Sequence, residues 1–244
     1  MQMHGANAEV PAHKANTRAE VVTQSAATCP RPTSLPIRLL LVEDETLFAK
    51  SLADWLSRNP GFEVVGVAGS GNQGWEFCLA NQPDIVLLDV QMDDMDGLTL
   101  AQRLRKELPA IRVIIMTGRV AAYVAWRAIQ ADVHGLLDKV IQPKVLAEAI
   151  RLVAAGERFI SPAFQEVQSE WLSTPDAFQK VLTNRELEVL MRVTDGQSDQ
   201  SIAEKLGISA ETVAGHRKSM RKKLGMHDDR HLMAYGRQWG IFGL

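Results

Sequence analysis

Five polar side chains stand where short apolar runs of the chain end, and their types suit phosphate chemistry. These residues are Glu43, Asp44, Asp89, Thr117 and Lys139. Three carboxylates in one pocket repel and raise one another's pKa, and a divalent cation relieves that repulsion. An all-oxygen ligand set suits Mg²⁺, while a hydroxyl and an ammonium can each bind a phosphoryl oxygen. The set indicates transfer of a phosphoryl group to a carboxylate, unless each acid merely ends its strand in solvent.

A second group of side chains, near the C-terminal end, is cationic and helical in its spacing. Arg217 stands four residues before Arg221, and Lys218 four residues before Lys222, so like charges are neighbours on a helix. This crowding costs stability in an isolated helix, and the phosphates of a nucleic acid relieve it. The pattern favours DNA binding over a solvated cationic face, because the segment before it has the spacing of a helix-turn-helix.

Both groups need elements that hold them in place, and residues 37–156 alternate between two periodicities. Apolar runs typical of buried parallel strands are found at residues 37–42, 62–67, 84–89, 111–116 and 135–138. A segment with helical spacing of apolar residues follows each run, and the last of these segments covers 145–155. Five such alternations predict an α/β fold with a doubly wound, parallel, five-stranded sheet. Ligands bind beyond the carboxyl ends of such strands, which is where the five polar residues stand.

Several segments around these polar residues match one known family. They are Leu-Leu-Leu-Val-Glu43-Asp44, Asp84-Ile-Val-Leu-Leu-Asp89-Val-Gln-Met, Asp96-Gly97, Thr117-Gly118 and Lys139. With them, residues 37–156 resemble the receiver domain of bacterial two-component response regulators. The resemblance implies a (βα)5 fold in which Asp89 accepts phosphoryl from a sensor histidine kinase and Thr117 and Lys139 contact that group. It also implies that Glu43, Asp44, Asp89 and the backbone carbonyl of Gln91 position Mg²⁺.

Two positions depart from the receiver pattern. The family usually has proline after the Met of the acceptor loop, whereas here Asp93 follows Met92 and forms an acidic pair with Asp94. The family also usually has Tyr or Phe three residues before the lysine as a rotating switch, whereas here Leu136 stands there. We therefore expect the signal to leave the site by a route other than an aromatic switch, or the domain to respond weakly.

Residues 180–244 are punctuated by helix start and stop signals. Thr183 and Glu186 have the spacing of a capping box, and Gly207 and Gly225 stand where predicted helices end. These signals predict an all-α domain of four helices. The tight turn Leu206-Gly207-Ile208-Ser209 between two of them is typical of a helix-turn-helix.

Within this region, residues 183 to about 242 are similar to the LuxR/NarL-type output domain, a four-helix DNA-binding unit. The match includes Leu182-Thr183, Ile202-Ala203, Thr212-Val213 and Lys223-Leu224-Gly225. It implies that Ser209–Leu224 is a recognition helix in the major groove and that the last helix dimerises. Ala214-Gly215 stands where family members often carry a larger residue, so base specificity is expected from Lys218 and DNA shape. The candidate DNA-binding residues are Thr212, His216, Arg217, Lys218, Arg221 and Lys222, of which His216 is equally explained as structural.

The formal net charge of −2 over 244 residues is a sum of opposite parts. Residues 37–179 hold 13 basic and 19 acidic residues, whereas residues 180–244 hold 11 basic and 8 acidic residues. The acidic part suits Mg²⁺ and phosphate, and the basic part suits DNA. A near-neutral total therefore does not exclude nucleic acid as a partner.

The other segments give weaker signals. Residues 1–36 contain no aromatic residue and predict a disordered N-terminal extension or a small partner-binding arm, and residues 157–179 predict a linker. Neither a signal peptide nor a membrane-spanning run is present in the sequence. Two cysteines, Cys29 and Cys78, cannot form a disulfide framework, so a reducing cytoplasm without a membrane partner is expected.

The sequence thus favours one function over a competitor. The favoured one is a DNA-binding transcription regulator of a two-component system, phosphorylated on Asp89 by a histidine kinase and homodimeric when active. The competitor is a receiver that docks a protein or ligand, with DNA binding independent of phosphorylation, which Leu136 and Asp93-Asp94 favour slightly. An independent enzyme is not expected, because the sequence contains no nucleophile–base pair and no cofactor loop.

Overall fold

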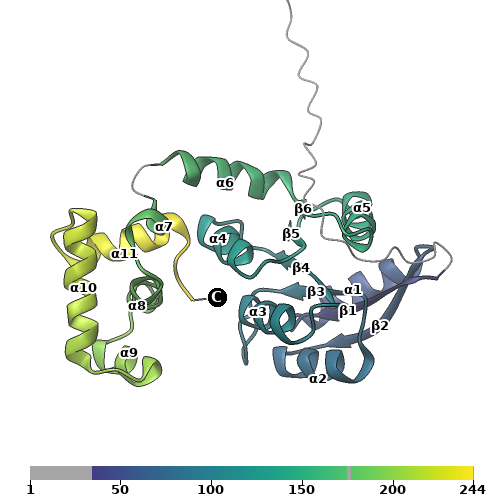
Figure 1. Ribbon diagram of the computed structural model, residues 1–244, viewed down its shortest axis with the longest axis horizontal. Coiled ribbons are helices and arrows are strands. Elements are labelled where there is room, and N and C mark those ends of the chain that lie inside the picture. The colour runs from purple at the N-terminus through teal and green to yellow at the C-terminus, as the bar shows by residue number, and fades with distance from the viewer. Residues whose placement is uncertain (1–34, 175–176, 244) are drawn as a thin grey trace, which may run out of the picture.

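A parallel sheet forms the first part of the chain. The computed structural model describes residues 35–174 and 177–243, so the predicted extension at 1–36 lies almost wholly outside the described residues. The strand order within the described chain is β2-β1-β3-β4-β5-β6 (Figure 1). The strands are β1 (Ile37–Val42), β2 (Phe62–Ala68), β3 (Ile85–Asp89), β4 (Arg112–Thr117), β5 (Gly135–Asp138) and β6 (Phe159–Ile160). The five predicted strands are confirmed to within one residue at each end, and β6 is an addition that pairs with β5.

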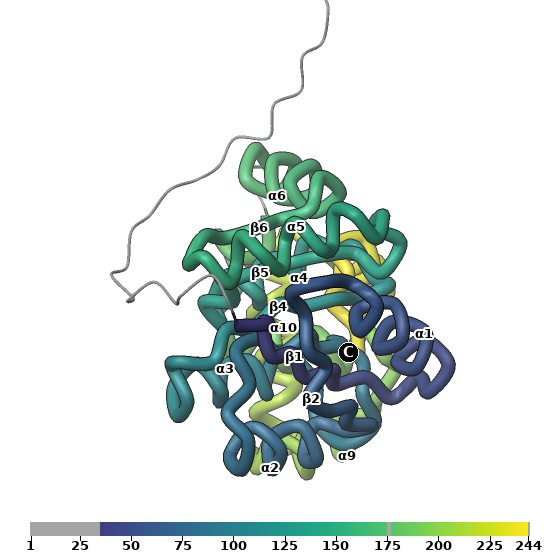
Figure 2. Tube along the Cα trace, turned by 90° about the vertical axis from the view of Figure 1, so that its right-hand side faces the viewer, coloured from purple at the N-terminus to yellow at the C-terminus, as the bar shows by residue number. Residues whose placement is uncertain are grey.

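Helices cover both faces of this sheet, because alternate residues of each strand point to opposite sides. Leu39 and Leu41 of β1 belong to the core with residues of α1 and α5, whereas Leu40 and Val42 belong to the core with residues of α2, α3 and α4. Burial on both sides explains why the strands read as continuous apolar runs. The helices are α1 (Thr46–Ser57), α2 (Gly71–Asn81), α3 (Gly97–Glu107), α4 (Ala122–Gln130) and α5 (Pro143–Ala154), and Figure 2 shows them around the sheet.

The register of the strands brings their carboxyl ends to one edge of the sheet. Asp89 of β3 pairs with Met116 of β4, and Thr117 of β4 pairs with Asp138 of β5. Immediately after β5, the Lys139 amide donates to the carbonyl of Thr117 at 2.9 Å. Glu43 and Asp44 follow β1, which pairs with β3, so the polar residues predicted to meet are positioned by four neighbouring strands.

The remaining elements are helical. They are α6 (Pro162–Ser173), α7 (Phe178–Val181), α8 (Asn184–Thr194), α9 (Asp199–Leu206), α10 (Ala210–Leu224) and α11 (Asp229–Trp239). The Thr183–Glu186 capping box is present, and Gly207 ends α9 with a positive φ of 64°. Both features confirm predictions from the sequence. None of the helices in the described ranges combines the length and hydrophobicity that crossing a bilayer requires.

An aromatic cluster joins the two parts of the molecule. Phe178 of α7 lies at its centre, with ring centroids 5.7 Å from Trp126, 5.8 Å from Trp171 and 5.9 Å from both Tyr123 and Trp239. Two of the rings belong to α4 of the sheet domain, and one belongs to α11 of the helical domain. The other two belong to α6 and α7, which connect the domains. The segment predicted to be a linker thus forms part of a packed interface between the sheet domain and the helical domain (Figure 1).

Candidate phosphoacceptor site and candidate DNA-binding helix

The strand ends form an acidic pocket with one lysine inside it. Glu43, Asp44 and Asp89 each offer a carboxylate oxygen within 4.8 Å of the others. Glu43 and Asp89 are each 5% exposed, whereas Asp44 is open to solvent. The Lys139 Nζ lies 2.8 Å from a carboxylate oxygen of Glu43 and 2.9 Å from Oδ2 of Asp89. The structure therefore brings together four of the predicted residues.

Burial and charge set the electrostatics of this pocket. Burial raises the pKa of Glu43 and of Asp89 above their usual values, and for Glu43 the nearby Asp89 charge adds to the increase. The hydrogen bonds from Lys139 oppose this in both cases. The two carboxylates in turn raise the pKa of Lys139, although its own burial acts in the opposite direction. The positive charge of Lys139 thus holds the two acids together, and a second positive charge would further stabilise their ionised forms.

This donor set fits Mg²⁺. All three side chains offer oxygen, which is the ligand that this cation prefers, and the exposure of Asp44 leaves the mouth of the pocket open to water and a phosphate. Gln91 reaches Asp89 through a backbone hydrogen bond. Its carbonyl stays a predicted ligand. A bound cation would take over from Lys139 part of the neutralisation of Glu43 and Asp89.

The loop after β3 orients Asp89, and one acid of its Asp93-Asp94 pair has a structural role. The Val90 amide donates to Oδ1 of Asp89 at 2.7 Å, which fixes the carboxylate. Further along the loop, the Asp94 carboxylate accepts from the amides of Gly71 and Asn72 at 2.9 Å each and so ties the loop to the start of α2. Both Asp93 and Asp94 are exposed, but Asp94 is a structural acid that motif matching missed.

Thr117 and Arg119 form one connection between the site and the rest of the molecule. Thr117 is completely buried, and its Oγ1 accepts from the Arg119 amide at 3.1 Å. Leu136, at the position of the usual aromatic switch, is 2% exposed and belongs to the core beside Phe164. Arg119 contacts the C-terminal segment of the chain, a role that the sequence did not indicate.

The predicted recognition helix is α10, and it begins as the sequence indicates. The Ser209 side chain accepts from the Thr212 amide at 3.1 Å and caps the helix. Thr212, Lys218 and Lys222 are exposed, and His216 is half-buried. Figure 1 shows α10 on the side of the helical domain that faces away from the sheet. The exposed face of α10 is therefore not covered by the first domain.

The two predicted arginines of α10 are engaged within the protein. The Arg217 guanidinium pairs with Asp199 of α9 at 2.7 Å and with Asp229 of α11 at 2.8 Å, and its side chain is 16% exposed. Arg221 pairs with the same Asp229 at 2.5 Å. These ion pairs fasten α10 to its neighbours and hold both guanidinium groups away from the outer face that carries Lys218 and Lys222.

Comparison with known families gives two matches. Residues 39–151 match the response regulator receiver domain, and residues 180–235 match the luxR family of bacterial regulatory proteins. Together the two matches cover more than half of the chain.

Known proteins are similar to most of this chain or to a part of it. The response regulator protein VraR of Staphylococcus aureus is 29% identical over 207 residues, which cover 85% of this chain and 99% of VraR. A LuxR-family two-component response regulator from Aurantimonas has 26% identity and a TM-score of 0.55 over 57% of this chain and 99% of that one. RcsB from Salmonella enterica, solved bound to a promoter, has a TM-score of 0.62 at 21% identity over 82% of this chain and 98% of its own, and shows the fold alone.

The receiver match, the acidic pocket and the helix-turn-helix therefore all indicate the same family. The chain belongs to the DNA-binding response regulators, with a receiver domain followed by a LuxR-type output domain.

Proposed function

We propose that Asp89 accepts a phosphoryl group from a sensor histidine kinase and that this modification controls DNA binding by a homodimer. The observation that carries the proposal is the placement of Lys139 between the buried carboxylates of Glu43 and Asp89. In the transfer, an oxygen of Asp89 forms a bond to phosphorus. The bond from phosphorus to the kinase histidine breaks, and its electron pair stays on that nitrogen.

Each residue of the pocket has a defined part in this step. Glu43, Asp44, Asp89 and the carbonyl of Gln91 would hold Mg²⁺, which when bound supplies positive charge to the phosphoryl oxygens. The Val90 amide keeps one oxygen of Asp89 fixed while the other reacts. In the proposal, the Lys139 ammonium and the Thr117 hydroxyl would bind oxygens of the product.

For DNA, we assign Lys218 and Lys222 to contacts with the phosphate backbone and the groove. Both are exposed on α10. Thr212 and His216 would help to fix the helix on the backbone of the DNA. Arg217 and Arg221, although candidates for the same contacts, would act mainly by holding α10 in place through Asp199 and Asp229.

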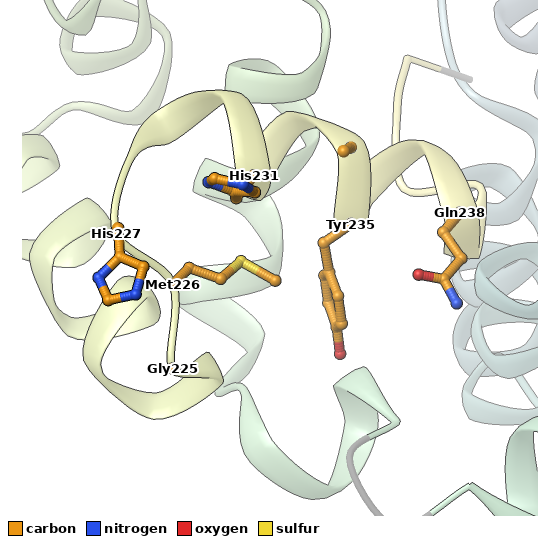
Figure 3. Close-up of a pocket in the computed structure, with 7 residues that line it drawn as sticks. Gly225, Met226, His227, His231, Tyr235 and Gln238 are labelled. Carbon is orange, nitrogen blue, oxygen red and sulfur yellow. The ribbon is translucent and has the colours of Figure 1, made fainter.

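The proposed dimer uses the outer face of α11. Leu232, Gly236 and Trp239 of this helix are buried against the domain. On another side α11 borders an open cavity of about 370 Å³, and Figure 3 shows Met226, Tyr235 and Gln238 around it. A second copy could bury this surface.

The domain limits that we propose are 37–156 for the receiver, 157–179 for the connecting segment and 180–244 for the output domain. A DNA-binding regulator with this organisation would work in the cytoplasm. In the proposal, chemistry at Asp89 is a signal and not the turnover of another substrate.

The proposal is tested by labelling with acetyl phosphate and Mg²⁺, followed by mapping of the modified peptide. We expect label on Asp89 in the wild type, none on Asp89→Asn, and wild-type labelling of Asp93→Asn, which removes an exposed acid from the same loop. Absence of label on Asp89, with unchanged DNA binding by Asp89→Asn, would instead favour the docking-module function.

A further inference from the structure

Residues 240–243 lie against the receiver, where Arg119 contacts them. The Arg119 guanidinium donates to the carbonyl of Gly240 at 2.7 Å and to the carbonyl of Gly243 at 3.0 Å. It also lies 3.2 Å from the centre of the Phe242 ring, where a cation is attracted by the aromatic face. A single receiver side chain thus makes three contacts with the segment 240–243, which follows α11.

The output domain holds the same segment from the opposite side. The Gly243 amide donates to Oδ1 of Asp195, at the end of α8, at 2.6 Å. Asp195 also attracts Arg119 and opposes the lowering of the pKa of that guanidinium by burial. Gly240 has a φ of +70°, and a Cβ at this position would overlap that of Ala121, so the chain approaches the receiver closely here. The charge of Asp195 and the small size of Gly240 therefore both favour the packing of segment 240–243 between the two domains.

The same arginine is linked to the phosphorylation site through its backbone. The Arg119 amide donates to Oγ1 of Thr117, which is buried at the end of β4, next to the strand that ends in Asp89. That bond uses the hydroxyl as acceptor and leaves its proton for a phosphoryl oxygen. If Thr117 moves toward a phosphoryl group on Asp89, the Arg119 backbone is drawn with it.

We propose that Arg119 is an interdomain latch, which holds segment 240–243 on the receiver and releases it when Thr117 engages a phosphoryl group on Asp89. The latch would regulate the proposed function. Its release by phosphorylation rests on the proposal that Asp89 is phosphorylated. It also provides a route for the signal that needs no aromatic residue at the position of Leu136.

The latch controls the arrangement of the domains and does not cover the DNA-binding surface. Helix α10 faces away from the receiver (Figure 1), so its exposed Lys218 and Lys222 are open while the latch is closed. What the latch fixes is α11, whose last residue, Trp239, is 8% exposed and packs on Phe178. Release frees the output domain to take the orientation that a dimer on DNA needs.

The test is amide hydrogen exchange of the full chain, read in peptides that cover α4 and residues 236–243. The variants are Arg119→Gln, Arg119→Lys, Asp195→Asn and the control Arg237→Gln, which removes an exposed cation from α11 beside the same segment. We expect Arg119→Gln to speed exchange in both regions by about tenfold or more without any phosphodonor. Arg119→Lys and Asp195→Asn should do so partially, because each keeps some of the contacts, and Arg237→Gln should behave as the wild type.

Acetyl phosphate with Mg²⁺ separates the latch from the proposed function. We expect it to speed exchange in the same peptides of the wild type and to add nothing in Arg119→Gln. Wild-type exchange in Arg119→Gln would overturn the latch, even if Asp89 is labelled. Fast exchange in Arg119→Gln with no response of the wild type to the phosphodonor would keep the interdomain contact but overturn its control by phosphorylation.

Discussion

At the residue scale, the pKa values of two buried acid–lysine groups shift in opposite directions, and the groups differ in how many acids share one lysine. In the receiver, Glu43 and Asp89 share Lys139, and burial raises the pKa of both acids. In the output domain, Glu186 has one lysine for itself, Lys223 at 2.7 Å, together with the Thr183 amide and the Ser219 hydroxyl. The receiver acids are left short of positive charge and are open to a cation. The Glu186 carboxylate accepts hydrogen bonds at both of its oxygens and connects α8 to α10.

Glu186 gives a prediction for stability against pH. Burial opposes its ionisation, but the hydrogen bonds from Lys223, Thr183 and Ser219 outweigh it and lower the pKa of Glu186 to about 2. Because the folded state lowers this pKa, its contribution of about 3 kcal/mol is present above pH 4.5 and is lost as the pH falls toward 2. The free energies of unfolding of the wild type and Glu186→Gln, measured with urea, should differ by about 3 kcal/mol at neutral pH. They should converge as the pH falls from 4.5 toward 2.

The control for this prediction is Glu188→Gln on the same helix. Glu188 pairs with Arg185 at 2.6 Å, but its side chain is 48% exposed, so its loss should cost less than about 1 kcal/mol. A difference between Glu186→Gln and the wild type that stays constant from pH 7 to pH 2 would show that Glu186 acts by packing alone.

Which side chains could be assigned from sequence depended on how local their partners are. Asp89, Thr117 and Lys139 were predictable because each stands at the carboxyl end of an apolar strand or directly after it, and strand order alone brings these ends together. Arg217 was predicted as a candidate for DNA contact on the recognition helix, but its partners Asp199 and Asp229 come from two other helices, and no periodicity relates them. The ion pairs of Arg217 therefore became visible only in the fold.

At the element scale, short loops set the position of the proposed phosphorylation site. Gly97 begins α3, and its amide donates to the carbonyl of Val90 at 2.9 Å, which folds the loop after β3 back on itself. A Cβ on Gly97 would overlap the backbone carbonyl of Asp89. The helix caps were predictable from single residues. The two-residue strand β6 was not, because Phe159-Ile160 is too short to show a periodicity.

The close approach at Gly97 predicts the effect of one methyl group. Gly97→Ala must displace the Asp89 backbone, and we expect it to lower the free energy of unfolding by about 3 kcal/mol and to slow labelling of Asp89. Gly215→Ala is the matched change, since nothing lies within 4 Å of a Cβ there. It should raise the stability of α10 by about 0.5–1 kcal/mol. Equal stability of the two variants in urea unfolding would contradict the packing described for Gly97.

At the scale of the whole molecule, the receiver and the output domain are joined by the rings around Phe178 and by segment 240–243. The existence of two domains with opposite charge could be predicted from the sequence. Their arrangement could not, because Tyr123 and Trp239 are remote in sequence and are brought together only by tertiary packing. This arrangement leaves α10 open, so DNA contact should depend directly on its exposed lysines.

The exposed lysines of α10 predict the salt dependence of DNA binding. Lys218→Ala with Lys222→Ala should weaken binding across sequences and reduce the slope of log affinity against log salt by about 2 for each output domain bound. Lys50→Ala with Lys144→Ala removes two exposed cations from the receiver and should leave the slope unchanged. Fluorescence anisotropy titrations at several salt concentrations measure both, and an unaltered slope in the first variant would remove these lysines from the interface.

The most direct test of the whole account is the DNA affinity of the full chain with and without acetyl phosphate and Mg²⁺. The probe is a duplex selected from a random-sequence pool by the phosphodonor-treated wild type, and affinity is measured by anisotropy. We predict that the phosphodonor raises the affinity of the wild type by about tenfold, within the usual range of coupling between sites, and leaves that of Asp89→Asn unchanged. An equal response of the two proteins, or no response of the wild type, would contradict control of DNA binding by phosphorylation of Asp89.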